Sequence, residues 1–296
     1  MRILVTGKSG QLGRSINKLI NTEVKADNNL ISSKFIFVGR EELDLSNNNS
    51  IIDYFDNHDK FDIVINSAAY TAVDKAEEEQ ELANQVNHLA VKQLAEIANK
   101  QQTKLIHIST DYVFDGESDK PYLELDATNP INVYGKTKLA GEQVLKEIMP
   151  TNAIIIRTSR VYSEYGNNFV KTMLKLSKER NELNVVSDQI GSPTYATDLA
   201  EAILKIISNK NYQNKGQPTE IYHYSNKGEI SWYDFTKEIF KLAKIDCKVS
   251  PITTKQYPTP ARRPRNSPLD NNKIMQFFNI NVSFWKDSLK EIFIND

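Results

Sequence analysis

Short, continuous apolar runs alternate with amphipathic helical stretches in the first half of this 296-residue sequence, and this alternation constrains its fold most strongly. Strands that are apolar on both faces are typical of parallel sheets covered by helices on both sides. With right-handed crossovers, the order predicts an α/β fold with a Rossmann-type, doubly wound parallel sheet. The apolar runs lie at residues 3–5, 35–38, 63–65, 105–108 and 154–156, and helices are predicted at about 11–20, 82–99 and 132–148.

The pattern changes after about residue 157. Five prolines between Pro251 and Pro268 predict an ordered surface loop there, because proline does not fit a helix interior or a central strand. We therefore expect a first domain over residues 1–157 and a smaller, interleaved C-terminal lobe over 158–296. Segments near 184–200 and 220–226 are expected to return to the first domain. Further helices are predicted near 167–179, 197–208 and 231–243, with strands near 184–187 and 220–225.

Composition argues against several classes of protein. Lys+Arg 37 against Asp+Glu 38 gives a net charge of −1, which does not fit a dedicated nucleic-acid binder. No apolar run approaches the ~20 residues of a membrane span. The single cysteine, Cys247, excludes an intramolecular disulfide framework and a Cys-rich zinc site. The chain reaches a Gly-rich turn by Gly7, which leaves no room for a signal peptide, and a cytoplasmic protein is expected.

Three glycines with even spacing follow the first predicted strand and open the first predicted helix. Gly7, Gly10 and Gly13 would allow a tight turn, a close approach of a pyrophosphate to the backbone, and close packing of helix on strand. Amide groups at the helix N-terminus would supply partial positive charge. Glycines also end strands for structural reasons alone, but this position favours an NAD(P)-binding site in residues 1–157.

The end of the second strand indicates which nicotinamide cofactor is used. A carboxylate there would bind ribose hydroxyls, whereas an arginine would favour the 2′-phosphate of NADP. The sequence has Arg40 near this point and no acid directly after the strand, which favours NADPH slightly over NADH. Arg40 as a solvated loop charge is the alternative. Asp44 and Leu45 could line the adenine pocket.

A tyrosine and a lysine stand four residues apart on the helix predicted for 132–148. Tyr134 and Lys138 therefore share one face, and a nearby ammonium group would lower the phenol pKa from about 10 toward the working range. Thr110 ends the fourth predicted strand, where ligands bind in such sheets, and could donate to the same carbonyl oxygen that Tyr134 protonates. Ala68 and Ala69 end the third strand and leave space for a flat ring. Small residues there could also merely ease packing.

Four further segments, residues 66–77, 109–116, 162–174 and 262–270, extend these motifs over nearly the whole chain. With the glycine turn, Thr110 and Tyr134-x-x-x-Lys138, they give a chain that resembles the extended short-chain dehydrogenase/reductases. Within them, it is most similar to the dTDP-4-dehydrorhamnose reductase family. The resemblance implies NAD(P)H-dependent reduction of the C4 ketone of dTDP-4-dehydro-L-rhamnose to dTDP-L-rhamnose, the last step of dTDP-rhamnose synthesis.

The resemblance also implies roles for individual residues. Tyr134 would supply the proton, Lys138 would lower the pKa of the Tyr134 phenol, and Thr110 would hydrogen-bond the substrate oxygen. Asp111 would contact the substrate with Thr110. Related dehydratases carry a second acid after this aspartate, and Tyr112 stands there instead, which favours simple reduction. The cofactor contacts implied are Gly10, Gln11, Leu12, Asp44, Leu45, Ala68, Ala69 and Tyr70, in addition to Tyr134 and Lys138.

Two arginines are candidate substrate contacts. Arg160 stands where the family typically has a tryptophan that contacts the sugar, and its guanidinium could hold a sugar ring or a diphosphate. It could equally indicate another nucleotide-diphosphate 4-keto-6-deoxy sugar as the substrate. Arg263 could close the substrate cleft or clamp a diphosphate. His107 and Trp232 are expected to be core residues.

Other readings stay open on the sequence alone. A non-catalytic, cofactor-binding regulatory subunit is a rival, since the regulatory β subunit of methionine adenosyltransferase resembles these reductases. Retention of Thr110, Tyr134 and Lys138 argues against it. Some reductases of the family bind magnesium at a dimer interface, but no residue cluster indicates a metal site here. A homodimer is compatible with the resemblance.

Overall fold

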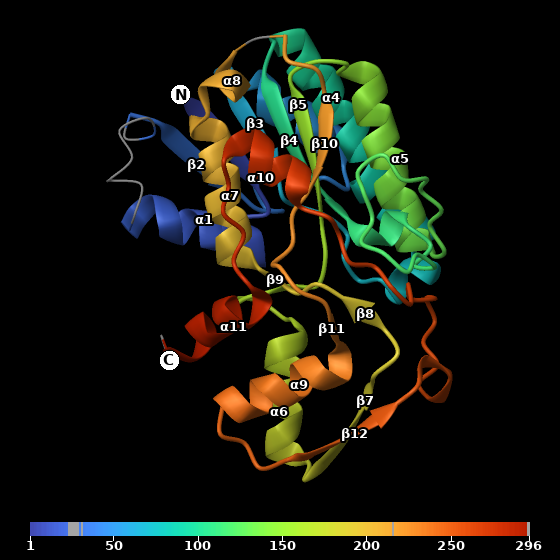
Figure 1. The fold of residues 1–296 in the computed structure, drawn as a ribbon. Helices are drawn as coiled ribbons and strands as arrows, with labels where there is room; N and C mark the ends of the chain where they lie inside the picture. Colours follow the sequence, from blue (N-terminus) through green and yellow to red (C-terminus); the bar gives the residue numbers. More distant parts are fainter. Residues whose placement is uncertain (23–29, 31, 215, 295–296) are drawn as a thin grey trace.

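The computed structural model describes residues 1–22, 30, 32–214 and 216–294, and its large sheet is parallel throughout (Figure 1). The order β10-β5-β4-β3-β1-β2 places the first strand between β2 and β3, so the strand order reverses its direction at β1. This confirms the predicted Rossmann-type, doubly wound α/β fold. The six strands are β1 (Arg2–Thr6), β2 (Lys34–Val38), β3 (Ile63–Asn66), β4 (Lys104–Thr110), β5 (Ala153–Thr158) and β10 (Glu220–His223).

Helices cover both faces of this sheet, because successive apolar residues of its strands are buried on one face and then on the other. On one face, Ile3 and Val5 of β1 pack with α1 and α7, and on the other, Leu4 packs with α2 and α4. Residues 82–99, expected as one helix, are divided by a π-helical turn over Gln85–Leu89. The helices around the sheet are α1 (Gln11–Thr22), α2 (Asn48–Asp56), α3 (Gln80–Asn84), α4 (Ala90–Gln101), α5 (Val133–Ile148), α7 (Ala196–Ser208), α8 (Lys210–Gln213) and α10 (Asn272–Phe278).

A smaller lobe lies beyond the carboxyl ends of the strands (Figure 1). Its apolar core joins α6, α9 and α11 through buried residues such as Met173, Phe235 and Leu289. Its elements are α6 (Phe169–Glu179), α9 (Trp232–Leu242), α11 (Trp285–Ile294) and the strands β7 (Glu182–Val186), β8 (Ile190–Gly191), β11 (Ile230–Ser231) and β12 (Lys248–Ile252). Two short strands, β6 (Val161–Tyr162) and β9 (Thr194–Tyr195), pair where the chain passes between the lobes.

After residue 158 the chain returns from the smaller lobe to the large sheet more than once. Residues 220–223 add β10 to the large sheet beside β5, and α7 packs on α1. The expectation for 184–200 is wrong at its start, because β7 pairs with β12 in the smaller lobe. Pro251 lies within β12 rather than in a loop. Proline is tolerated there because β12 pairs only with β7 in this two-stranded sheet of described residues.

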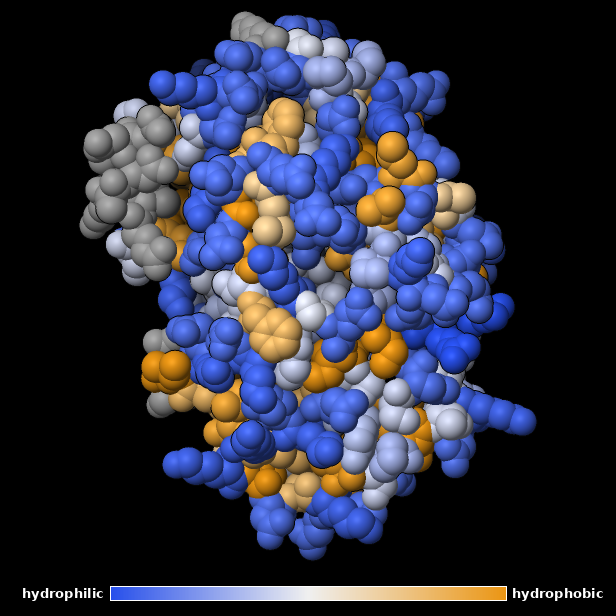
Figure 2. Space-filling view, in the orientation of Figure 1, coloured by the Kyte–Doolittle hydropathy of each residue, from blue (hydrophilic) through white to orange (hydrophobic). Residues whose placement is uncertain are grey.

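Hydrophilic residues predominate on the face shown in Figure 2, and hydrophobic ones lie there in small, separate groups. The large apolar side chains of the sheet are buried instead, among them Ile3, Leu4 and Ile63. Among the described helices, none combines the length and the apolar character needed to cross a bilayer.

Candidate active site

A cavity of about 990 Å³ lies at the carboxyl ends of the strands, between the large sheet and the smaller lobe. Ligands bind at this edge in open α/β sheets. The cavity brings together most of the residues singled out from the sequence, with the exceptions of Gly13 and Arg263. The residues that were predicted from the sequence and line the cavity are Gly7, Gly10, Gln11, Leu12, Arg40, Asp44, Leu45, Ala68, Ala69, Tyr70, Thr110, Asp111, Tyr134, Lys138 and Arg160.

The glycine turn has the shape that a bound pyrophosphate requires. Gly7 has φ +75°, in the left-handed region that favours glycine. A Cβ atom at Gly13 would lie 2.3 Å from the Gly7 carbonyl oxygen, so a side chain there would force helix and turn apart. Gly10 leaves the N-terminus of α1 open to the cavity, where unpaired amides attract anions. The turn therefore fits a dinucleotide.

The loop after β2 places a cation and an anion at one end of the cavity. Arg40 Nε lies 3.3 Å from Asp44 Oδ2, and the Arg40 side chain is 75% exposed. Asp44 Oδ1 accepts hydrogen bonds from the Ser46 amide at 2.9 Å and the Ser46 hydroxyl at 2.7 Å. Burial alone would raise the pKa of Asp44, but these hydrogen bonds and Arg40 lower it overall. The loop thus offers a hydrogen-bonded carboxylate and an exposed guanidinium.

Thr110 and Tyr134 meet at the end of β4. Asn132 caps α5 by accepting the Gly135 amide at 2.8 Å, which places Tyr134 in the first turn of the helix. Burial raises the pKa of the Tyr134 phenol, while its hydrogen bond with Thr110 lowers it. The phenol is therefore protonated at neutral pH, the form that a proton donor needs.

The Lys138 side chain is directed at the end of β4. It is 1% exposed, and Nζ lies 2.6 Å from the Ile108 carbonyl oxygen and 3.3 Å from His107 Nε2. Burial lowers the pKa of Lys138 to about 8, and the carboxylate of Glu142 acts in the opposite direction. The groups that shift the pKa of Tyr134 are Thr110, Asp111 and Tyr112, so the structure does not show the expected tuning by Lys138.

Asp111 is a buried carboxyl group beside the catalytic candidates. It is 2% exposed, and its Oδ2 accepts from Ser267 at 2.6 Å while Oδ1 accepts from Thr110 at 3.1 Å. Burial raises the pKa of Asp111 to about 6, against the lowering effects of Ser267 and Arg160. A polar, partly ionised group therefore faces the place where a substrate carbonyl would lie.

The comparisons with known proteins agree with this geometry. A family model described as "RmlD substrate binding domain" matches residues 1–295. A dTDP-4-dehydrorhamnose reductase of Aggregatibacter actinomycetemcomitans is 43% identical and covers 98% of each chain. The chain belongs to the dTDP-4-dehydrorhamnose reductase family.

Solved structures of this family have the same fold. A dTDP-4-dehydrorhamnose reductase from Clostridium acetobutylicum superimposes with a TM-score of 0.90 at 42% identity, covering 100% of this chain and 99% of that one. The Bacillus anthracis dTDP-4-dehydrorhamnose reductase, solved in complex with NADP, has a TM-score of 0.89 at 37% identity and the same coverage.

Arg160, at the position where the resemblance led us to expect a tryptophan, is held by an aromatic residue that sequence reasoning assigned to the core. Its guanidinium lies 4.2 Å from the ring centroid of Trp232, the first residue of α9. Arg160 also donates to the carbonyl oxygens of Ile230 at 2.8 Å and Gln189 at 3.1 Å. Trp232 lines the cavity as well. A cation and the aromatic ring on which it stacks therefore line the cavity together.

Arg263 lies outside the cavity lining. It donates to Asp74 Oδ2 at 2.7 Å and to the Ala261 carbonyl at 2.9 Å. Asp74 in turn accepts the Ala261 amide at 3.1 Å. Asp74, the ionic partner of Arg263, therefore connects the 259–265 segment to the residues after β3. Burial raises the pKa of Tyr112, which lines the cavity, and the charge of Arg263 acts in the opposite direction.

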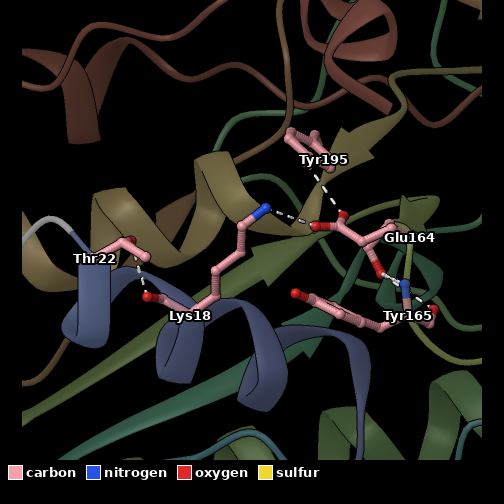
Figure 3. A network of polar contacts seen from close by, with 6 residues as sticks. Lys18, Thr22, Glu164, Tyr165 and Tyr195 are labelled. Carbon is pink, nitrogen blue, oxygen red and sulfur yellow. Dashed lines mark hydrogen bonds and ion pairs between the residues drawn. The ribbon is translucent and has the colours of Figure 1, made fainter. Parts of the chain in front are cut away.

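A loop of the smaller lobe is bonded to α1 beside the glycine turn (Figure 3). Glu164 accepts from Lys18 Nζ at 3.1 Å through one oxygen and from the Tyr195 hydroxyl at 3.1 Å through the other. The side chain of Gln11 donates to the Val161 carbonyl at 3.2 Å and accepts from Ser163 at 2.9 Å. Gln11, a predicted cofactor contact, therefore also joins the two lobes.

Proposed function

We propose that this protein reduces the C4 ketone of dTDP-4-dehydro-L-rhamnose to give dTDP-L-rhamnose, with NADPH preferred over NADH. The observation that carries the proposal is the convergence of Thr110, Tyr134 and Lys138 on the same cavity as the glycine turn, in a chain of this reductase family. The NADP complex of the Bacillus anthracis relative supports the cofactor.

The residues divide the reaction between them. Reduced nicotinamide supplies the hydride that reaches C4. Tyr134 gives its phenolic proton to the oxygen as that oxygen gains negative charge. The single hydroxyl hydrogen of Thr110, directed at Asp111 Oδ1 in the free protein, turns to the same oxygen when the substrate binds. Lys138 offers the cavity an N–H for a ribose hydroxyl of the dinucleotide. The products are a secondary alcohol and oxidised nicotinamide, which balances one hydride and one proton.

The direct test mixes the purified protein with enzymatically prepared dTDP-4-dehydro-L-rhamnose and follows the loss of NADPH or NADH absorbance. We expect rapid oxidation with formation of dTDP-L-rhamnose. Binding of NADPH without oxidation would reject the substrate. Activation of a partner enzyme by a protein that does not turn over would instead support the regulatory-subunit alternative.

Arg40 should determine the cofactor preference. Replacing it by serine removes the exposed guanidinium that would meet a 2′-phosphate, while Asp44 and Ser46 keep their own hydrogen bonds. We expect the KM for NADPH to rise about tenfold and the KM for NADH to stay within about twofold. Arg180→Ser, an exposed site in the smaller lobe, is the matched control. Equal effects on both cofactors would contradict the assignment.

Arg160 should act in substrate binding. Each of its terminal nitrogens has a second hydrogen beyond those used on Ile230 and Gln189, and the group lines the cavity. For Arg160→Met we expect the KM for the sugar nucleotide to rise about tenfold or more, with a smaller change in kcat. An unchanged KM would remove Arg160 from the binding site. Arg160 also favours a second candidate, reduction of another nucleotide-diphosphate 4-keto-6-deoxy sugar, which a panel of such sugars would reveal.

The proposed setting of the enzyme is the cytoplasm. The buried, free thiol of Cys247 fits a reducing compartment. A homodimer and the absence of nucleic-acid partners are part of the same proposal, and gel filtration tests the first. Within the described ranges, His, Cys, Asp and Glu side chains form no group of three or more suited to a metal ion. Magnesium is therefore not part of the proposal.

A further inference from the structure

Three polar side chains of α1 contact the loop formed by residues 163–168 of the smaller lobe. Gln11, Arg14 and Lys18 are spaced by three and four residues, so they lie on one side of the helix. Gln11 and Lys18 form the hydrogen bonds and the ion pair to this loop described above. The guanidinium carbon of Arg14 lies 4.2 Å from the ring centroid of Tyr165. One side of α1 is therefore bonded to the 163–168 loop along two turns.

Helix α1 itself is fixed in the core of the large sheet. Its residues Leu12, Ile16 and Leu19 are buried and pack with apolar residues of β1 and α7. The N-terminus of the same helix lines the cavity, where its amides would meet the diphosphate of a dinucleotide. The contacts made by α1 therefore set where the 163–168 loop lies relative to that diphosphate.

The 163–168 loop also lines the cavity, through Gly166 and Asn167. A Cβ atom on Gly166 would lie 3.5 Å from Gln11 Cγ, so the loop backbone is in contact with the first residue of α1. Neither Gly166 nor Asn167 was among the predicted cofactor contacts. The part of the cavity that would receive the diphosphate is thus bounded by the glycine turn, by α1 and by this loop.

Glu164 bonds the loop to two other elements (Figure 3). One carboxylate oxygen accepts from Lys18 of α1, and the other accepts from the hydroxyl of Tyr195 in β9. Burial raises the pKa of the Tyr195 phenol, so the hydroxyl keeps the hydrogen that it donates. The Tyr195 amide donates to Asn226 Oδ1 at 2.7 Å, which fixes this residue in turn. Glu164 is therefore held from both sides.

We propose that the 163–168 loop is a wall of the dinucleotide site and that Glu164 is a positioning residue that holds this wall closed over the bound diphosphate. The Lys18 and Glu164 side chains are 40% and 26% exposed, so solvent screens the pair and leaves it weak enough to open. Contacts of the closed, bound state act mainly on the rate of dissociation. The inference rests on the nicotinamide cofactor of the proposed function and not on its sugar substrate.

The test measures how fast NADPH leaves the protein. NADPH-loaded protein is mixed with excess NADP⁺ in a stopped-flow instrument, and the fall in nicotinamide fluorescence is followed. For Glu164→Ala we expect release about tenfold faster, because an ion pair and a hydrogen bond to a charged group are lost. The association rate should stay within about twofold. Glu182→Ala, which removes an exposed pair with Lys248 inside the smaller lobe, is the matched control and should leave release within about twofold.

Two further variants separate the contacts of Glu164. Lys18→Met should accelerate release about threefold alone and should add nothing to Glu164→Ala, because the two changes remove the same ion pair. Tyr195→Phe removes the hydroxyl and keeps the ring that stacks on Tyr162, with 5.7 Å between centroids. It should also accelerate release about threefold. Because its ring remains packed, Tyr195→Phe decides the matter if the melting curve of Glu164→Ala shows that this variant does not fold.

Three results would overturn the proposal. The first is an NADPH release rate that is unchanged in Glu164→Ala and Tyr195→Phe, and the second is an equal acceleration in Glu182→Ala. The third is a double variant of Lys18 and Glu164 in which the two single effects multiply, which would assign them to separate causes. A protein that bound neither NADPH nor NADH would overturn the proposal together with the cofactor. Normal NADPH binding without sugar reduction would reject only the proposed substrate.

Discussion

Tyr134→Phe should reduce kcat by about 10²–10⁴-fold, because it removes the phenolic proton that the substrate oxygen takes up. The ring itself remains, so its T-shaped contact with Tyr112, at 5.6 Å between centroids, is retained. We therefore expect nearly unchanged NADPH binding and melting temperature. Stopped-flow measurement of NADPH oxidation at saturating substrate checks the rate, and fluorescence titration checks the binding.

Tyr257→Phe is the matched control for this prediction, since it removes a phenol that is 58% exposed. It should leave kcat within about twofold, as expected of a surface change of this kind. A Tyr134→Phe enzyme that retained more than a tenth of the activity would show that another group or water supplies the proton. The catalytic assignment would then pass from Tyr134 to Thr110 and Asp111.

Glu142→Gln should cost about 3–5 kcal/mol of unfolding free energy, because it leaves a buried guanidinium without its counter-ion. The Arg157 and Glu142 side chains are only 3% and 2% exposed. Arg157 binds both carboxylate oxygens, with Nε 3.0 Å from Oε1 and Nη2 2.7 Å from Oε2. Urea denaturation at neutral pH measures the loss as a lower midpoint.

Glu96→Gln provides the comparison, since Glu96 forms an exposed i,i+4 pair with Lys92. That change should cost less than about 0.5 kcal/mol. A Glu142→Leu, Arg157→Leu double variant should recover much of the lost stability, because no charge is then left buried without a partner. If Glu142→Gln were as harmless as Glu96→Gln, the buried pair would contribute nothing to stability.

The large sheet was predictable from the sequence because its strands are apolar on both faces. All six of its strands begin and end within two residues of the predicted ones. Helices α2 and α10 were not predicted, since their apolar residues are spaced among Asn, Asp and Lys and gain their burial only from distant elements. The loop expected from Pro251 to Pro268 begins only after Ile252, because the pairing of β12 with β7 depends on the tertiary fold.

The site was predictable where its residues form short motifs in the sequence. The glycine turn, Thr110 and Tyr134-x-x-x-Lys138 are short motifs next to strand ends, and the structure brings them to one cavity. His107 is buried in the core, as expected from the sequence. Trp232 was also assigned to the core but lines the cavity, because a single sequence does not show which face of a buried element meets a ligand. The stacking of Arg160 on Trp232 joins residues 72 positions apart, a contact that no local spacing encodes.

The repeated passage of the chain between the lobes has a consequence for dissecting this protein. A fragment ending at residue 157 would lack β10 and α7, so β5 would become a bare sheet edge and the apolar side of α1 would face water. Exposed edges of this kind pair with other chains and aggregate. Nucleotide affinity therefore belongs to the intact polypeptide, and exchanging sugar specificity between relatives calls for grafting loops such as 159–168 rather than swapping halves.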